Sequence, residues 1–185
     1  MKLLTNTLYG NVDPDILTKA AKIKLLVCDV DGVFSDGRIY LGNDGEELKA
    51  FHTKDGFGVK ALAASGVAIA IITGRRSSIV KNRMTALNVE HIIQGQENKL
   101  PALLSLAKTL NIHNTEIAYI GDDMPDLPCI IDVGLGVAVQ DAHPLVLNKA
   151  NFTTFTRGGF GAVREVCDLI MQCQNTLKNA TGASI

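Results

Sequence analysis

The sequence lacks a strong excess of either charge, and it lacks a long apolar run. Its 18 Lys and Arg residues nearly balance 19 Asp and Glu residues, so nothing favours nucleic acid or an anionic membrane as a partner. The longest apolar run lies near residues 67–72 and is too short to cross a bilayer. In the opening MKLLTNTLYG, polar residues at 5–7 interrupt the apolar start, which argues against a signal peptide. We therefore expect a cytoplasmic protein.

Cysteine and histidine are also sparse, with four of each. No two cysteines form a C-x-x-C pair, so we expect buried free thiols in a reducing compartment. The histidines share no metal-ligand spacing, which argues against a zinc site. The cysteines are Cys28, Cys129, Cys167 and Cys173, and the histidines are His52, His91, His113 and His143.

The chain does contain short, apolar, β-branched runs that alternate with helical stretches. This alternation predicts an α/β fold with a doubly wound, Rossmann-like parallel sheet and helices on both faces. The 185 residues fit one domain, 1–185, in which we expect residues 1–12 and 179–185 to be flexible.

The boundaries of the predicted elements follow from caps and breakers. Gly, Asn and Asp at 42–45 separate two strand-like runs and predict a β-hairpin. Asp13-Pro14 opens the first helix as N-cap and N1 residue. Strands are predicted at 24–28, 38–41, 47–52, 68–72, 91–93, 117–120 and 135–139, and later helices at 55–66 with Asp55 as cap, 77–87, 98–110 and 162–177.

Reactive side chains follow the ends of several predicted strands. Ligands of such sheets bind beyond the carboxyl ends of the strands. Each residue alone has an ordinary explanation as a turn, a helix cap or a surface charge. The set comprises Asp29 and Asp31 after the first sheet strand, Thr73 after the second, Lys99 at a helix start, and Asp122, Asp123 and Asp126 after the strand at 117–120.

Together these residues predict phosphoryl transfer. Several carboxylates at one sheet end repel one another unless a cation lies among them, and oxygen ligands suit Mg²⁺. Asp29 and Asp31 are two residues apart in an extended segment, so both can face one pocket. One carboxylate can attack phosphorus, and a second can act as acid and then base. A hydroxyl and an ammonium can hold the phosphoryl oxygens.

The sequence resembles the haloacid dehalogenase (HAD) superfamily in four motifs, DVDG at 29–32, Thr73-Gly74-Arg75, Lys99 and GDDMPD at 121–126. The resemblance implies that Asp29 is the nucleophile and Asp31 the general acid/base. Thr73 and Lys99 are then phosphoryl ligands. It further implies that Mg²⁺ binds the Asp29 carboxylate, the Asp31 main-chain carbonyl and Asp122, with Asp126 outside the first ligand shell. An Asp at 31 favours phosphatase over dehalogenase chemistry.

Longer segments resemble a capless subfamily that hydrolyses a sugar acid phosphate in lipopolysaccharide synthesis. They include residues 25–60, QGQENK, VAVQDAHP and GGFGAVREVCDLI. The gaps between motifs leave no room for a lid domain. The resemblance implies a homotetramer in which the hairpin of one subunit covers a neighbour's site. It also implies substrate contacts by Asp31, His52, Thr53, Lys54, Asp55, Gly56, Lys60, Arg75, Arg83 and Lys99.

Two departures from that subfamily affect the substrate assignment. Members often carry Arg where this chain has Lys60, and Lys lacks the bidentate fork of Arg. They also often carry Arg where this chain has Phe160. The alternatives are therefore a related phosphatase for another sugar acid, such as a nonulosonate 9-phosphate, or an inactive binding module. A phosphorylated receiver domain fits less well, because its acceptor Asp follows the third strand.

Overall fold

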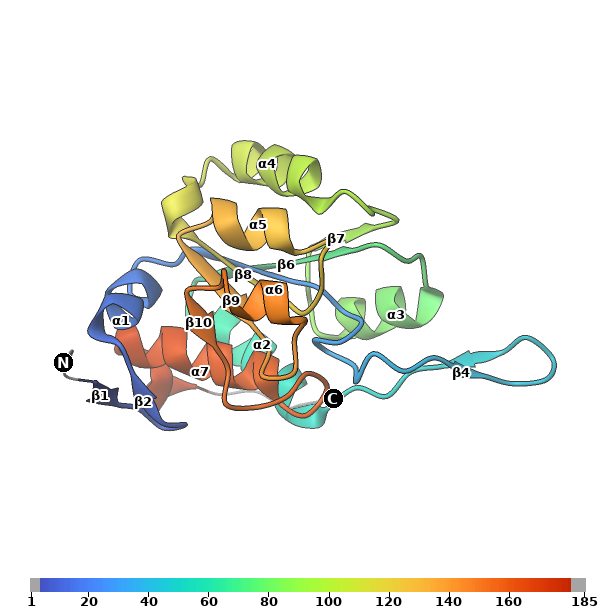
Figure 1. Cartoon of the computed structure of the whole chain (residues 1–185), viewed down its shortest axis with the longest axis horizontal. Helices are drawn as coiled ribbons and strands as arrows, with labels where there is room; N and C mark the ends of the chain where they lie inside the picture. Colours follow the sequence, from blue (N-terminus) through green and yellow to red (C-terminus); the bar gives the residue numbers. More distant parts are fainter. Residues whose placement is uncertain (1–3, 181–185) are drawn as a thin grey trace.

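A computed structural model describes residues 4–180. Its centre is a six-stranded, fully parallel sheet with strand order β10-β9-β8-β3-β6-β7 (Figure 1). The strands are β3 (Leu25–Cys28), β6 (Ala68–Thr73), β7 (His91–Gln94), β8 (Ile117–Gly121), β9 (Leu135–Ala138) and β10 (Phe152–Thr153). The five strands predicted for this sheet are confirmed within one residue at each end, and β10 is an addition that the pattern did not reveal.

Helices cover both faces of the sheet, as the doubly wound prediction requires (Figure 1). On one face, α2 packs against α7 and α7 against α1, whereas α4 and α5 pack together on the other. The helices are α1 (Pro14–Ala20), α2 (Thr53–Ala64), α3 (Ser78–Ala86), α4 (Lys99–Leu110), α5 (Leu127–Asp132), α6 (Pro144–Leu147) and α7 (Ala162–Cys173), with short 3₁₀ turns η1 (Asn114–Glu116) and η2 (Leu177–Asn179).

The strands of this sheet are apolar because both of their faces are covered. Every residue of β3 is buried, and β3 pairs with β6 on one side and β8 on the other. Such strands show continuous apolar runs instead of alternation. Cys28 of β3, Cys129 of α5 and Cys167 of α7 are buried free thiols, and Cys173 is partly buried.

Two helix boundaries differ from the prediction. The N-cap of α2 is His52, whose ring accepts from the Lys54 N–H, so Asp55 lies inside the first turn and is buried. The last helix ends at Cys173 rather than near residue 177. Asn175 has φ 59°, a left-handed conformation that terminates an α-helix.

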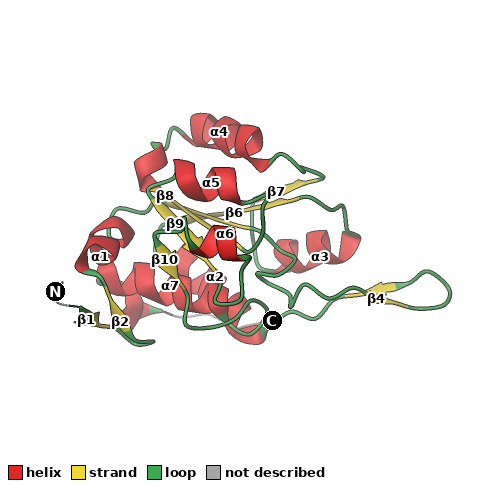
Figure 2. Ribbon diagram, in the orientation of Figure 1, coloured by secondary structure: helices red, strands yellow, loops and turns green. Residues whose placement is uncertain are grey.

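The predicted hairpin is present but its paired strands are short. Only β4 (Tyr40–Leu41) and β5 (Glu47–Leu48) pair, in antiparallel register, and the rest of each arm is irregular (Figure 2). The hairpin projects from the body of the molecule (Figure 1). This hairpin is too small to be a domain, and no segment within residues 4–180 forms a separate domain over the carboxyl ends of the strands. This agrees with the expected capless fold.

The N-terminal segment is more structured than we expected. β1 (Thr5–Asn6) pairs with β2 (Asn11–Val12), and the Tyr9 hydroxyl donates to Asp168 of α7 at 2.8 Å. This contact, together with the burial of Val12, ties the segment to the domain. The expected flexibility of residues 1–3 and 181–185 concerns positions outside the described residues.

Candidate active site

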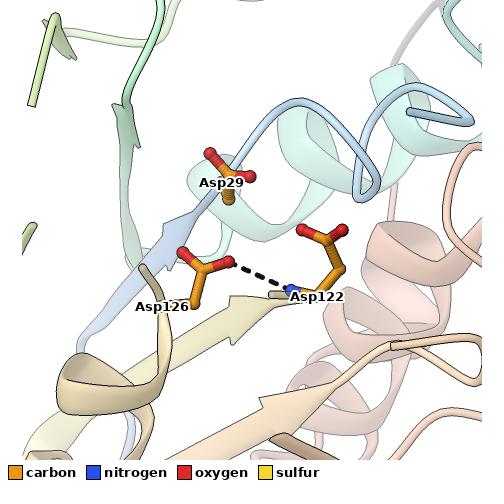
Figure 3. A group of neighbouring side chains, drawn as sticks. All are labelled: Asp29, Asp122 and Asp126. Carbon is orange, nitrogen blue, oxygen red and sulfur yellow. Dashed lines mark hydrogen bonds between the residues drawn. The ribbon is translucent and has the colours of Figure 1, made fainter. Parts of the chain in front are cut away.

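Three carboxylates meet at the carboxyl ends of two neighbouring strands. Asp29 follows β3 and Asp122 follows β8, and the register that pairs Cys28 with Ile120 brings these two exits together. Asp126, the N-cap of α5, completes the group. One oxygen from each carboxylate lies within 4.8 Å of the others, and Figure 3 shows the three side chains around one space. The predicted acidic cluster is therefore formed by residues from separate segments.

Gly32 permits the close approach of Asp122 to the loop after β3. A Cβ atom on Gly32 would lie 2.1 Å from an oxygen of the Asp122 carboxylate, and the φ of Gly32 is 92°. A side chain at this position would therefore be both strained and in collision with the cluster. This geometry explains why the loop after Asp31 needs glycine.

Asp126 is fully occupied by protein donors. Its Oδ1 accepts from Lys99 Nζ at 2.6 Å and from the Tyr119 hydroxyl at 2.7 Å. Its Oδ2 accepts from the backbone N–H groups of Asp122 and Asp123 at 3.1 and 3.3 Å. Because all four hydrogen bonds of the Asp126 carboxylate come from protein donors, this carboxylate holds its neighbours in place. The oxygens of Asp29 and Asp122 have more lone pairs free to bind a ligand.

Lys99 lies between two members of the cluster. It is the first residue of α4, its side chain is 4% exposed, and its Nζ forms an ion pair with Asp29 Oδ1 at 2.7 Å. Burial lowers the pKa of Lys99, but the facing Asp29 and Asp126 carboxylates outweigh this effect and raise it above its ordinary value. The ammonium therefore stays charged.

One lysine does not neutralise the cluster. Burial, followed by repulsion from Asp126, raises the pKa of Asp29 in spite of Lys99. Burial and the charges of Asp29 and Asp126 raise the pKa of Asp122 to about 8. Three closely spaced carboxylates, two of them with raised pKa values, and an oxygen-only ligand set fit a small divalent cation.

The cluster lies at the base of a cleft of about 540 Å³. The cleft lining contains the four predicted catalytic residues, the other two carboxylates of the cluster and Arg75. Its lining residues are Asp29, Asp31, Gly37, Thr73, Gly74, Arg75, Glu97, Lys99, Asp122, Asp123, Pro125 and Asp126.

The remaining predicted substrate contacts do not line this cleft in the single chain. They lie on the first two turns of α2 or on α3, and they are His52, Thr53, Lys54, Asp55, Gly56, Lys60 and Arg83. The backbone N–H of Arg164 donates to Asp55 at 2.8 Å, so Asp55 links α2 to α7. Burial raises the pKa of Asp55 to about 7. The Arg83 guanidinium packs against Gly56.

Two residues of the hairpin's return arm reach the site, and the sequence analysis did not identify them. The Lys49 ammonium contacts the Asp31 carboxylate, and Glu47 accepts from Arg75 at 3.0 Å. The signal available in the sequence was the alternation of Glu47, Leu48 and Lys49, which places the two charged residues on one face.

The glycine-rich loop before α7 packs against the loop after β3. A Cβ on Gly158 would lie 1.7 Å from the Gly32 carbonyl oxygen, so only glycine fits there. Phe160 of this loop is half-exposed, and the Arg157 guanidinium lies 4.7 Å from its ring centre. Phe160 is not among the cleft-lining residues of this chain.

Comparisons with known proteins agree with this geometry. Residues 89–163 match the family model for haloacid dehalogenase-like hydrolases. A 3-deoxy-D-manno-octulosonate 8-phosphate phosphatase of Yersinia pestis is 53% identical over 97% of this chain and 96% of its own length. The protein of the same name from Escherichia coli K12 is 50% identical over 97% and 95%.

Solved structures similar to this chain include phosphatases of the same name. The crystal structure of the Yersinia pestis phosphatase has a TM-score of 0.97 and 52% identity, covering 100% of both chains. A Moraxella catarrhalis phosphatase of the same name, in complex with magnesium, phosphate and a KDO molecule, has a TM-score of 0.88 and 46% identity, covering 89% of this chain and 95% of its own.

The fold and the four motifs define a hydrolase of the haloacid dehalogenase class. Within this class, the chain belongs to the 3-deoxy-D-manno-octulosonate 8-phosphate phosphatase family. Among the residues that the structure describes, no helix combines the length and apolar character that a membrane span requires.

Proposed function

We propose that this chain hydrolyses 3-deoxy-D-manno-octulosonate 8-phosphate to the free sugar acid and inorganic phosphate, a step of lipopolysaccharide synthesis. The observation that carries the proposal is the arrangement of Asp29, Lys99 and the two further carboxylates at the base of the cleft. Relatives of this name share about half of the sequence over nearly the whole chain, which supports the choice of substrate.

The site fits Mg²⁺. The Asp29 and Asp122 carboxylates and the Asp31 main-chain carbonyl would hold the ion, and Asp126 would keep Asp122 in place through its backbone N–H. When bound, the ion offsets negative charge on the phosphoryl oxygens during transfer. Magnesium in the Moraxella relative supports this assignment.

The residues of the chain divide the chemistry among them. An Asp29 oxygen attacks phosphorus and forms an aspartyl-phosphate, while the bond from phosphorus to the sugar oxygen breaks. Asp31 gives its proton to the leaving oxygen. Asp31 then takes a proton from water, which attacks the phosphorus, releases phosphate and regenerates the Asp29 carboxylate. Thr73 and Lys99 hold the phosphoryl oxygens throughout.

A sugar acid also presents a carboxylate, which calls for cationic partners. Arg75 lines the cleft and is the best-placed candidate in the single chain. Lys54, Lys60 and Arg83, with the backbone and polar groups of His52, Thr53, Asp55 and Gly56, complete the proposed substrate set. Since they lie outside the cleft of one chain, their contribution requires either substrate-induced movement or a neighbouring subunit.

The proposal includes a cytoplasmic homotetramer in which a neighbour's hairpin closes each site. The hairpin exposes several large apolar side chains, and Leu41 is 71% exposed in the single chain. Several large apolar side chains exposed on one short projecting hairpin are typical of an interface. The exposed apolar residues of the hairpin are Ile39, Tyr40, Leu41 and Leu48.

A phosphate-release screen tests the proposed function. Purified enzyme is given the octulosonate 8-phosphate, a nonulosonate 9-phosphate and simple sugar phosphates, each with Mg²⁺ and with chelator. We expect the highest kcat/KM for the eight-carbon substrate and no turnover in chelator. A preference for the nine-carbon substrate would favour the sister phosphatase, and Lys60→Arg and Phe160→Arg would then show which departure sets the preference. No turnover of any ester would indicate a binding module.

A further inference from the structure

The side chain of Lys49 is buried on a hairpin whose residues are mostly exposed. It is 1% exposed, although the neighbours Leu48 and Ala50 are both exposed. Lysine is rarely buried to this extent unless its charge is paired. The Lys49 ammonium contacts Asp31 Oδ1 and lies 3.5 Å from Glu47 Oε1. The cost of burying this side chain is therefore offset by carboxylates of the active site itself.

Two residues at the end of β5 reach the cleft. Glu47, in β5, contacts Arg75, and Lys49, just after β5, contacts Asp31, whereas Leu48 between them is exposed. Glu47 Oε2 accepts from Arg75 Nη2 at 3.0 Å. A continuous chain of charged contacts thus joins the cleft-lining Asp31 and Arg75 through two hairpin residues of the same chain.

The two motif aspartates have separate lysine partners. Lys99 faces Asp29 and Asp126 from α4, and Lys49 faces Asp31 from the hairpin. Asp29 must reach phosphorus, whereas Asp31 must reach first the leaving oxygen and then a water molecule. A carboxylate that can rotate freely loses much of the benefit of proximity, so a fixed partner for Asp31 has a direct use.

We infer that Lys49 is a positioning residue for the acid/base carboxylate, an inference that rests on the phosphatase function proposed above. Lys49 holds Asp31 in the orientation that serves proton transfer and prevents the carboxylate from turning toward Lys99 or the cation. Glu47 in turn holds both Lys49 and Arg75, so the hairpin organises the site of its own chain. Lys49 acts through Asp31 and does not contact phosphorus.

The test is phosphoenzyme formation by Lys49→Met in a rapid-quench, single-turnover experiment. Two esters are compared, the sugar 8-phosphate with a poor leaving group and an aryl phosphate with a good one. We expect a loss of about 10- to 100-fold with the sugar ester, a much smaller loss with the aryl ester, and little change in KM. Lys49→Arg should recover most of the rate, and the exposed Lys22→Met serves as the matched control.

A double-mutant cycle decides whether Lys49 acts through Asp31. Phosphoenzyme formation from the sugar ester, the substrate on which Lys49→Met has its large effect, is followed over long single turnovers in Asp31→Asn with and without Lys49→Met. Within the Asp31→Asn background, the second substitution should change the rate by less than about twofold, because the group that it positions is already gone. If Lys49→Met does not fold, Lys49→Gln replaces it in both experiments.

Four results would overturn the inference. A rise in KM with unchanged kcat would make Lys49 a substrate ligand. Equal losses with both esters, or an undiminished loss in the Asp31→Asn background, would make it a structural anchor of the hairpin. Wild-type turnover that needs Mg²⁺ and is abolished by Asp29→Asn establishes the phosphatase independently. An unaffected Lys49→Met in that setting therefore refutes only the positioning role.

Discussion

Lys99 Nζ lies 2.7 Å from Asp29 Oδ1, so the proposed nucleophile faces a buried ammonium whose pKa is raised by its carboxylate neighbours. The same ammonium contacts Asp126 at 2.6 Å, which fixes its position. Lys99 therefore offsets charge on the nucleophile before reaction and can offset charge on the phosphoryl oxygens during it.

Replacing Lys99 should therefore slow the reaction severely. We expect Lys99→Ala to cost on the order of several kcal/mol in transition-state stabilisation, seen as a fall in kcat/KM of about a thousandfold or more. Lys108→Ala, on the exposed face of the same helix, is the control and should leave kcat/KM unchanged. A near-normal rate in Lys99→Ala would show that its charge plays no part in the chemistry.

The two motif aspartates should fail in different ways. Asp29→Asn should remove turnover and any phosphoenzyme, because the attacking oxygen is lost. Asp31→Asn should also stop turnover, but with an aryl phosphate it should accumulate phosphate on Asp29, because that leaving group needs no proton. Peptide mapping by mass spectrometry identifies the modified residue. Asp44→Asn at the exposed hairpin tip is the control, and phosphate on a residue other than Asp29 would refute the assignment.

Mg²⁺ affinity should increase with pH. The pKa of Asp122 is raised to about 8, so its folded-state proton competes with the ion below that pH. A raised carboxyl pKa also means that the metal-free fold loses stability as pH rises from the unfolded pKa toward 8, because the folded state binds the proton more tightly. Mg²⁺ should therefore bind at least about tenfold more tightly at pH 8 than at pH 6.

Isothermal titration and the thermal shift caused by Mg²⁺ at the two pH values measure this dependence. The thermal shift should be larger at pH 8. Asp122→Asn should bind Mg²⁺ weakly at both values and lose part of the pH dependence, because Asp29, whose pKa is also raised, remains as a ligand. An affinity that is flat or that falls between pH 6 and pH 8 would contradict the proposed ligand set.

The hairpin should hold the oligomer together. Leu41→Ser with Leu48→Ser removes exposed apolar surface from both strands, and we expect a shift to smaller species in sedimentation and a loss of substrate selectivity. Mg²⁺ binding should change little. Leu104→Ser, at an exposed apolar position on α4, is the matched control. A wild-type enzyme that is monomeric at assay concentration and fully selective would rule out the shared site.

Mixed subunits test the sharing directly. Asp29→Asn subunits keep an intact hairpin, and subunits lacking residues 43–46 keep an intact nucleophile. If a neighbour's hairpin completes each site, the mixture should regain activity that neither variant has alone. Equal mixtures that stay inactive despite forming hybrid oligomers would show that each chain uses only its own hairpin.

The sequence by itself determined five of the six strands of the central sheet, the four motifs and the absence of room for a lid. Buried parallel strands carry continuous apolar runs, and parallel strands bring their carboxyl ends to one edge of a sheet, so residues 29, 73 and 122 follow as neighbours from local pattern alone. Local pattern fixes such features because each depends on a few adjacent residues.

Only the tertiary structure decided the partners of these residues. The Lys99 contact with Asp126, the Lys49 contact with Asp31 and the packing of Gly158 on Gly32 join separate segments of the chain. The same applies to Asp55, which the sequence presents as a helix cap. In the fold it is buried inside the first turn of α2 and accepts a hydrogen bond from α7. Such contacts depend on how helices and loops pack across the sheet, and no local periodicity encodes that packing.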